Sequence, residues 1–289
     1  RGGLAVDYMS NDLQLTQRGS IPGPHDLTIV TTIQGVRRAY YIDKNEIYTA
    51  FISEDGLTLS EASSTGIANN TNKKAWGVPD AVVLPDGRIR IYWVDDDPEV
   101  GGEADEFILS ATSTSITGIN FVIDEGKRVE GGYVDFEILK AKENDWVAIM
   151  SSSPETIPNQ PQGIYIGVSK DGLTWEIKVD SIAPTDKSYL DPTGILFPNS
   201  INKWRIIMSQ SPSIRGEREY SLVAAELTYT TTTSTTGNDH IQTTSQNDYI
   251  DGLSGTDTLT ITGKFSDYTF TRGTDTLQIA DQRTTGTTD

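Results

Sequence analysis

Four aspartates that begin apolar segments at nearly regular intervals are the residues with the clearest chemical potential. Asp26, Asp80, Asp135 and Asp191 are separated by 54, 55 and 56 residues. If a repeating fold brings them to a common centre, their like charges raise one another's pKa unless a cation or an arginine neutralises them. Carboxylates with separated pKa values serve as acid and base in glycoside hydrolysis, so the pattern indicates a sugar-cleaving site.

Two other interpretations of these aspartates stay open. A ring of carboxylates could hold a cation in a central channel. Alternatively, each aspartate only caps a turn by accepting backbone N–H bonds, and recurrence in every repeat is what such a building role predicts. Glu137 lies two residues after Asp135, so on a strand both side chains point to one side and Glu137 joins the candidate site.

Aromatic or imidazole side chains lie shortly before the candidate carboxylates. They are His25, Trp76, Tyr133 and Tyr189. Because aromatic side chains combine a large apolar face with a polar edge or tip, these four residues are expected at the mouth of a sugar-binding channel. Ordinary packing between neighbouring repeats is the alternative.

A second, shorter repeat follows a threonine-rich stretch. Three nonapeptides, 234–242, 243–251 and 252–260, each carry aspartate at the sixth place and an apolar residue at the eighth. Aspartate offers a hard oxygen ligand and a glycine turn lets backbone carbonyls converge, which together suit Ca²⁺. A turn region that binds no ion is the alternative. The expected calcium-site residues are Asp239, Asn247, Asp248, Gly255 and Asp257.

The composition excludes several classes of protein. The chain of 289 residues has 23 Lys+Arg against 41 Asp+Glu, which gives a formal net charge of −18. This charge argues against a nucleic-acid binder and against a polybasic membrane-surface protein. The absence of cysteine excludes disulfides, Cys-ligated zinc and a thiol nucleophile. No apolar run reaches the length of a transmembrane helix, so no membrane span is expected.

The segments that must position these residues read as β-strands almost throughout. Short runs rich in Val, Ile, Tyr, Trp and Thr alternate with Asp-Gly, Asn and Pro turns. Clear Ser-x-Asp-Gly turns occur at 53–58 and 169–175. After each spaced aspartate comes a second apolar strand, at 38–42, 88–94, 146–150 and 204–208.

A repeat of about 55 residues with four short strands predicts a β-propeller, because one twisted sheet cannot bury both faces without neighbouring sheets. Four inner-strand starts, and the segment 4–17 as the outer half of another blade, predict five blades. A four-bladed ring closed by the amino-terminal strands is the alternative. The all-β chain is thus expected to form a propeller over 1–228, a Thr-rich linker over 229–236 and a small β module over 237–289.

The long repeat resembles the five-bladed furanosidase-type glycoside hydrolases, and its Ser-x-Asp-Gly turns resemble those of Asp-box propellers. The first resemblance implies that Asp26 acts as base, that Asp80 tunes the pKa of the acid and that Glu137 is the acid. Two departures stand out. No Gly-Pro follows Glu137, and Asp191 adds a carboxylate where those enzymes need none.

The nonapeptides resemble haemolysin-type (RTX) calcium repeats, which implies Ca²⁺ binding and folding after export. The expectation is a secreted or cell-surface bacterial protein whose propeller recognises glycans and can act as a glycoside hydrolase. The competing hypothesis is a non-catalytic extracellular structural, adhesive or appendage component. Expected partners are glycans or extracellular proteins, with no nucleic acid, and the chain is expected to be part of a longer polypeptide or assembly.

Overall fold

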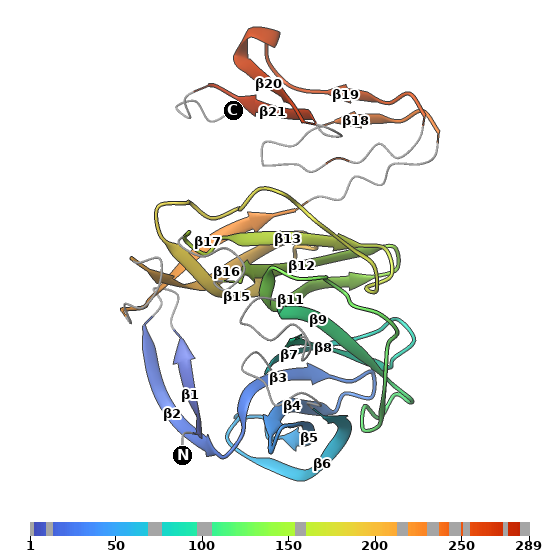
Figure 1. The fold of residues 1–289 in the computed structure, drawn as a ribbon, viewed down its shortest axis with the longest axis vertical. Coiled ribbons are helices and arrows are strands. Elements are labelled where there is room, and N and C mark those ends of the chain that lie inside the picture. The colour runs from blue at the N-terminus through green and yellow to red at the C-terminus, as the bar shows by residue number, and fades with distance from the viewer. Residues whose placement is uncertain are drawn as a thin grey trace. The chain divides into compact units, whose positions relative to one another are not determined.

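The structure is a computed structural model that describes residues 3–9, 14–68, 77–96, 106–153, 160–212, 219–229, 237–242, 250, 255–273 and 277–283. The chain divides into two compact units, Arg1–Leu227 and Thr228–Asp289. The regular secondary structure in the described parts of both units consists of β-strands, and the only helix there is one short 3₁₀ turn (Figure 1). No helix in these ranges has the length and apolar character needed to cross a membrane.

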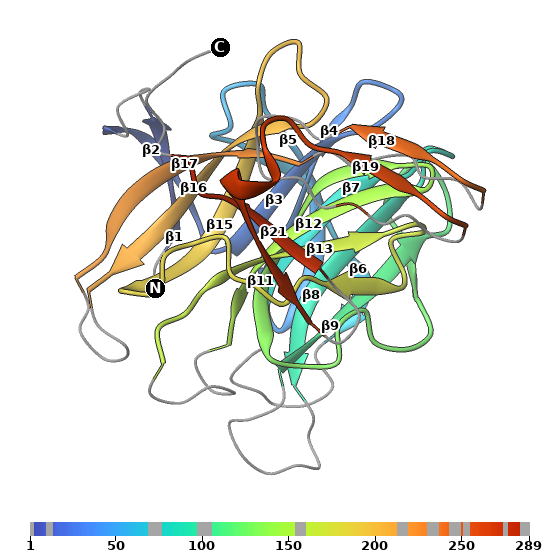
Figure 2. The ribbon, with the colours of Figure 1, turned by 90° about the horizontal axis from the view of Figure 1, so that it is seen from above.

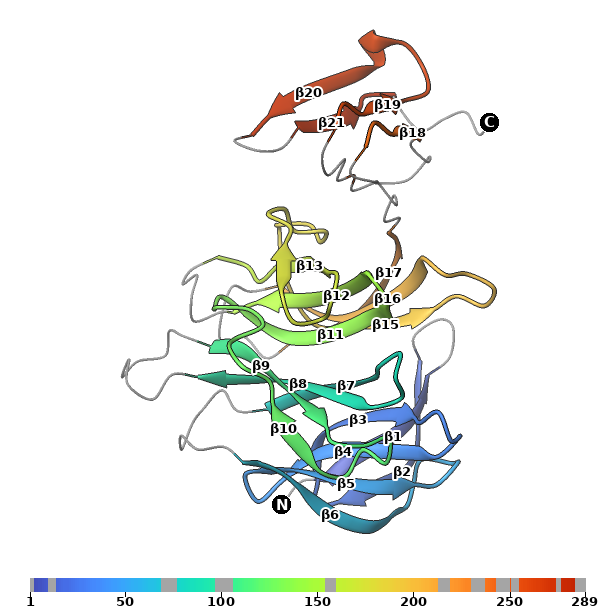
Figure 3. The same cartoon turned by 90° about the vertical axis from the view of Figure 1, so that its right-hand side faces the viewer.

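The first unit is an all-β propeller in which each blade runs in chain order from an inner strand outward. Figure 3 shows the first three sheets following one another in the same order. The first blade is β3 (His25–Thr31), β4 (Arg37–Asp43), β5 (Glu46–Ile52) and β6 (Leu59–Ala68). The second is β7 (Gly77–Val83), β8 (Ile89–Asp96), β9 (Glu106–Ser113) and β10 (Phe121–Ile123). The third is β11 (Tyr133–Lys142), β12 (Asp145–Ser152), β13 (Ile164–Ser169) and β14 (Trp175–Ile177). The fourth is β15 (Ser188–Leu196), β16 (Lys203–Ser211) and β17 (Ser221–Thr228).

The structure shows four blades and a separate hairpin, so the prediction of five blades is not confirmed. Among the described strands, β1 (Gly3–Met9) and β2 (Leu15–Pro22) pair only with each other. The hairpin lacks the inner pair of strands that begins every other blade. Its residue Ile21 is buried against Ala39 and Ala50 of the first blade. Figures 1 and 2 show the hairpin on the side of this unit where β15–β17 also lie.

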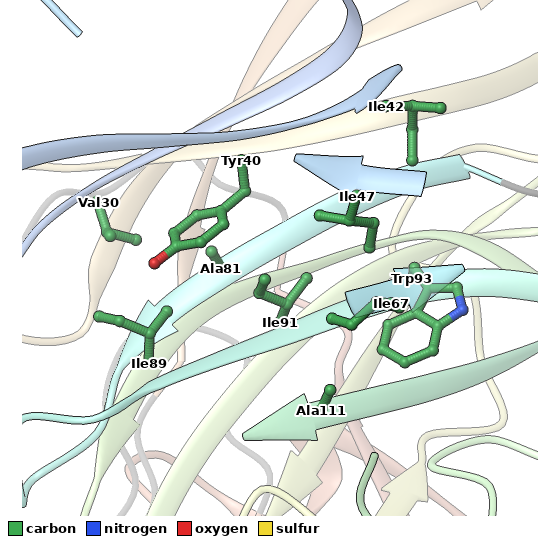
Figure 4. Packing of buried hydrophobic residues seen from close by; sticks show 10 residues of the cluster. All are labelled: Val30, Tyr40, Ile42, Ile47, Ile67, Ala81, Ile89, Ile91, Trp93 and Ala111. Atoms are coloured by element: carbon green, nitrogen blue, oxygen red, sulfur yellow. The ribbon is translucent and has the colours of Figure 1, made fainter. Parts of the chain in front are cut away.

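The apolar core lies between neighbouring blades. One cluster joins the first and second blades, and its central side chains are shown in Figure 4. Tyr40 of β4 and Tyr92 of β8 occupy equivalent places, and each donates its hydroxyl hydrogen to a glycine carbonyl in an outer turn of the next blade. Tyr40 bonds to Gly118 at 2.8 Å, and Tyr92 bonds to Gly172 at 2.7 Å. The same contact therefore locks successive blades together.

The Ser-x-Asp-Gly turns connect the third and fourth strands of a blade. In the turn after β13, Asp171 Oδ1 accepts the backbone N–H groups of Leu173 at 2.7 Å and Thr174 at 2.9 Å. In the turn after β5, Asp55 Oδ1 accepts the N–H of Leu57 at 3.0 Å. These aspartates satisfy backbone donors that the tight turn leaves unpaired, which is a structural role.

The second unit contains two short strand pairs in its described residues. β18 (His240–Gln242) and β19 (Thr258–Thr260) are parallel, whereas β20 (Tyr268–Arg272) and β21 (Leu277–Asp281) are antiparallel and follow the 3₁₀ turn η1 (Phe265–Asp267). Of the predicted linker 229–236, only Tyr229 lies within the described residues. The predicted β module over 237–289 stays a prediction.

Replacement of Gly172 tests the lock between the second and third blades. Gly172 has a φ of 71°, and an added Cβ would lie 2.8 Å from the Trp146 ring and from the Tyr92 hydroxyl. We expect Gly172→Ala to lower the free energy of unfolding by about 2–4 kcal/mol through strain and crowding. Urea unfolding followed by tryptophan fluorescence measures this change.

Gly126 supplies the matched control. Its φ is 80°, but the nearest atom to an added Cβ is 3.6 Å away, on Arg128. Gly126→Ala should therefore cost only the backbone term of roughly 1–2 kcal/mol. Equal losses in the two variants would contradict the crowding at Gly172.

Candidate functional site

Every inner strand carries the same β-bulge near its start. In each blade the pairing with the second strand skips two residues, as it does between His25 and Thr28 in β3. A bulge bends the strand and re-aims its side chains, and a positive φ is uncommon for residues other than glycine. The first skipped residue, which we call the bulge position, has a positive φ in all four blades: Asp26 (49°), Val78 (51°), Asp135 (53°) and Asp191 (49°).

The position of the bulge shows that the alignment of the four aspartates suggested by the sequence is wrong for the second blade. Asp80 does not occupy the bulge position of the second blade, because Val78 does. Asp80 instead pairs with Tyr92 just after the bulge, as Glu137 pairs with Ile149 in the third blade. We call this second place the pairing position. The two remaining blades have threonine there, namely Thr28 and Thr193.

Carboxylates at the bulge position bond to the backbone of the next blade. Asp26 Oδ2 accepts the N–H of Val78 at 3.4 Å, and Asp135 Oδ2 accepts the N–H of Asp191 at 3.3 Å. Donor and acceptor lie 52 and 56 residues apart. Each bond therefore links adjacent blades.

Carboxylates at the pairing position form a second set of links between blades, with shorter hydrogen bonds. Asp80 accepts the Thr28 hydroxyl of the first blade at 3.1 Å and the Ile138 N–H of the third blade at 2.7 Å. Glu137 Oε1 accepts the Thr193 hydroxyl at 2.8 Å and the Gly194 N–H at 2.7 Å, both from the fourth blade. Asp80 and Glu137 thus connect all four blades, although neither occupies the bulge position.

Burial raises the pKa of Asp80, Asp135, Glu137 and Asp191, and repulsion between carboxylates adds to the shift in the last three. Desolvation raises the pKa of Asp80 to about 6. Desolvation and then the negative charge of Asp80 raise the pKa of Glu137 to about 7. Desolvation and the charge of Asp191 raise the pKa of Asp135 to about 6. Desolvation, with a smaller contribution from Asp26, also raises the pKa of Asp191.

The same carboxyls remain accessible from solvent. Asp26 and Asp191 are exposed, and Asp80, Asp135 and Glu137 are half-buried. Within the described residues, no lysine, arginine or histidine forms an ion pair with any of the five. The structure therefore places the five predicted carboxylates near the starts of the inner strands, where Glu137 is influenced by the charge of Asp80 and Asp135 by the charge of Asp191.

The predicted channel-mouth residues differ in their surroundings. Tyr133 is half-buried and packs edge-on against Tyr165, with ring centroids 5.3 Å apart. Tyr189 is buried, and its hydroxyl accepts a hydrogen bond from Gln210 Nε2 at 3.0 Å. Both contacts lie within a single blade, between β11 and β13 and between β15 and β16. His25 is exposed, and Trp76 lies outside the described residues.

The calcium-site prediction is only partly covered by the structure. β18 and β19 pair in parallel with a register of 18 residues, so Asp239 and Asp257 come side by side two nonapeptides apart. Their contact is a hydrogen bond from the Asp239 N–H to Asp257 Oδ1 at 3.0 Å. An added Cβ on Gly255 would meet the Gly237 carbonyl at 2.4 Å, which explains the need for glycine. Asn247 and Asp248 lie outside the described residues.

No group of three or more His, Asp or Glu side chains is arranged to hold a metal ion in the described parts of either unit. This finding covers the inner-strand carboxylates as well as Asp239 and Asp257. The residues at 243–249 and 251–254 are not included in it.

Thr28, Thr193 and Ser151 belong to the site and were not predicted. A signal for the threonines was present, because the first and fourth repeats read Asp-x-Thr where the third reads Asp-x-Glu. That pattern places Thr28 and Thr193 level with Glu137. Ser151 of β12 pairs with Val134 and interacts with the adjacent Asp135 carboxylate, and no sequence pattern marks it.

Comparison with known proteins gives a shared fold. No family model and no curated protein matches the sequence. An endo-arabinase from Bacteroides thetaiotaomicron is 15% identical, with a TM-score of 0.52 over 70% of this chain and 74% of that chain. An alpha-L-arabinanase from Penicillium chrysogenum, solved with arabinobiose, is 13% identical, with a TM-score of 0.50 over 78% and 66%. A thermostable family-43 glycoside hydrolase is 17% identical, with a TM-score of 0.52 over 72% and 70%. At these identities the likeness establishes the propeller fold alone.

The raised pKa values predict that stability falls as pH rises. The folded state holds protons on Asp80, Asp135 and Glu137 more tightly than the unfolded chain, in which carboxyls titrate near about 4. Their contribution is fully present below that range and is lost as pH rises through about 6 to 7. The urea midpoint should therefore decrease between about pH 5 and about pH 8.

Two variants separate this effect from general charge repulsion. Asp135→Asn removes one of the titrating groups and should flatten the decrease. Glu61→Gln removes an exposed charge on the outer strand β6 and should leave the slope unchanged. A pH profile that is equally steep in both variants would contradict the assignment to the inner strands.

Proposed function

We propose that the first unit acts on glycans as a glycoside hydrolase. The observation that supports this most is the pKa of Glu137, raised to about 7 beside the Asp80 charge and within reach of solvent. A carboxyl of this kind is protonated often enough at neutral pH to serve as a general acid. The propeller fold shared with arabinan-cleaving enzymes adds support from analogy.

In this mechanism Glu137 protonates the oxygen of the leaving sugar. Both hydrogen bonds to Glu137 arrive at Oε1, so the proton resides on Oε2 and that atom is the donor. The exposed Asp26 carboxylate acts as base and accepts a proton from the attacking water. Asp80 does not exchange a proton with the substrate, because its negative charge serves to keep Glu137 protonated.

A non-catalytic role is the second candidate, and one observation favours it. Asp26, Asp80, Asp135 and Glu137 all accept hydrogen bonds from the next blade. A propeller that serves only as an extracellular adhesive or structural platform needs these links and no chemistry. The two candidates differ in whether Glu137 must be protonated for function.

We also propose that the second unit binds Ca²⁺ and that the protein works outside the cell or at the cell surface. The parallel pairing of β18 with β19 at a distance of two nonapeptides supports a repeating roll. The ligands would come from Asp239, Asp248 and Asp257 with Asn247 and the turn at Gly255. Extracellular calcium would then be available to stabilise the unit after export.

Substitution of Glu137 tests the hydrolase proposal. Glu137→Gln keeps an acceptor for Thr193 and Gly194 but cannot donate the catalytic proton, so kcat on a cleaved glycan should fall by about 10²–10⁴-fold. In the wild type kcat should decrease as pH rises through about 7, because the acid loses its proton. Release of reducing sugar from arabinan, xylan and aryl glycosides measures both effects, with Glu61→Gln as the control. Equal release by the wild type and Glu137→Gln on every substrate would remove the proposal.

Calcium titration tests the second unit. Millimolar Ca²⁺ should raise the melting temperature and a chelator should reverse the rise, whereas Mg²⁺ should have little effect because it prefers octahedral, hydrated sites. Asp257→Asn should weaken the response. A melting temperature that is the same with calcium and with chelator would refute calcium binding.

A further inference from the structure

A lysine, an aspartate and an asparagine meet where the third blade adjoins the fourth. Lys140 lies on β11 and Asp145 begins β12 of the same blade, whereas Asn202 lies in the turn between β15 and β16, 62 residues from Lys140. Lys140 Nζ donates a hydrogen bond to Asn202 Oδ1 at 2.7 Å and forms an ion pair with Asp145 Oδ2. One amine therefore contacts both a carboxamide and a carboxylate.

A second irregularity in β11 precedes Lys140 and has no counterpart in the other inner strands. All four strands carry the bulge near their start, but only in β11 does the pairing shift again, between Ile138 and Lys140. Such a shift re-aims the side chains that follow it. Lys140 is only 8% exposed, although lysine is almost never buried without a partner.

The asparagine is held against Lys140 by its own turn and by the neighbouring strand. The Ser200 hydroxyl oxygen accepts the backbone N–H groups of Asn202 at 3.3 Å and Lys203 at 2.9 Å. Two residues beyond Asn202, the buried Trp204 donates its Nε1–H to the Leu139 carbonyl of the third blade at 3.2 Å. The carboxamide and the amine are thus fixed relative to each other from both sides of the blade boundary.

These contacts place an amine next to an electrophilic carbon. A carbonyl carbon is about 1.2 Å from its oxygen, so Lys140 Nζ lies within about 4 Å of Asn202 Cγ. Reacting atoms held at about 3–3.5 Å gain a large advantage over the same groups free in solution. The Asp145 carboxylate beside Nζ can take a proton from the amine and pass it to a leaving group, as a general base and acid does.

We propose that Lys140 and Asn202 form an isopeptide bond that joins the third and fourth blades covalently, with Asp145 as the proton carrier. Asp145 takes a proton from the ammonium group, and the freed lone pair of Nζ attacks Asn202 Cγ. The Cγ–Nζ bond forms and the Cγ–Nδ2 bond breaks. Of the three ammonium protons, one stays on the new amide nitrogen and two pass through Asp145 to Nδ2, which leaves as ammonium. No oxidant or other reactant is consumed.

The bond closes a loop of 62 residues between two blades that share no ladder of backbone hydrogen bonds. A cross-link of this kind stabilises a protein by restricting its unfolded chain. The chain has no cysteine, so a disulfide cannot supply such a link. The inference concerns a modification of the chain itself and does not depend on the proposed action on glycans.

Mass spectrometry of the denatured full-length chain tests the proposal. The wild type should be lighter than its sequence requires by one molecule of ammonia. Digestion with trypsin should release the peptides of Lys140 and Asn202 joined as one branched peptide. Lys140→Arg keeps a hydrogen-bond donor but cannot form the amide, and it should have the full mass, as should Asn202→Ala. Asp145→Ala should slow the formation of the bond by about 10²–10⁴-fold, because the proton carrier is lost.

Lys187 and Gln210 supply a control within the same chain. Lys187 Nζ donates to Gln210 Oε1 at 3.4 Å, and no acidic side chain of a described residue forms an ion pair with Lys187. A lysine and a carboxamide are therefore in contact there without a carboxylate. We expect the peptides that contain Lys187 and Gln210 to remain unlinked in the same digest.

Two outcomes would overturn the inference. If the wild type has the full mass of its sequence, the contact is an ordinary hydrogen bond and ion pair. If the loss of ammonia persists in Lys140→Arg, or maps to a peptide without Lys140, the ammonia comes from another side chain. Circular dichroism shows whether each variant is folded, and the wild-type mass and its branched peptide decide the question even where a variant does not fold.

Discussion

A hydrogen bond that a backbone N–H group of the next blade donates to a carboxylate is the interaction on which the inner part of this propeller depends. Neighbouring inner strands belong to different sheets and share no ladder of backbone bonds. Side chains must therefore supply the polar links where the blades converge. Asp80, with acceptor contacts to Thr28 of one blade and Ile138 of another, shows how a single carboxylate joins three blades.

This way of joining blades brings several negative charges into one partly desolvated place. Burial, and for Asp135 and Glu137 also repulsion from a neighbouring carboxylate, then raises the pKa values of Asp80, Asp135 and Glu137 to about 6 to 7. In the proposed mechanism, the same geometry that holds the blades together also generates the proton donor. The structural role and the proposed chemical role are compatible, because one constraint produces both.

The repeat and its strands could be predicted from sequence, but the alignment of residues within it could not. The second strands predicted at 38–42, 146–150 and 204–208 fall inside β4, β12 and β16, and the one predicted at 88–94 begins one residue before β8. Aligning aspartate with aspartate, however, placed Asp80 level with Asp135 when it is level with Glu137. The cause is the two-residue bulge, which depends on backbone dihedral angles and strand pairing. No particular residue type marks its position in the sequence. The blade count differed for a related reason, since a two-stranded hairpin and the outer half of a full blade have the same sequence pattern.

Val78 shows that the fold requires the backbone conformation of the bulge position and not a carboxylate side chain there. It is a β-branched residue at a φ of 51°, a conformation that costs on the order of 1–3 kcal/mol and persists only where surrounding structure imposes it. Its N–H still donates to Asp26, so the link between the first two blades needs the backbone of this position and not a carboxylate. The second blade therefore keeps the bulge while omitting one charge from a crowded centre. By the same reasoning, the carboxylate of Asp191 is not demanded by the joining of blades, because its side-chain hydrogen-bond partner is Ser209 of its own blade.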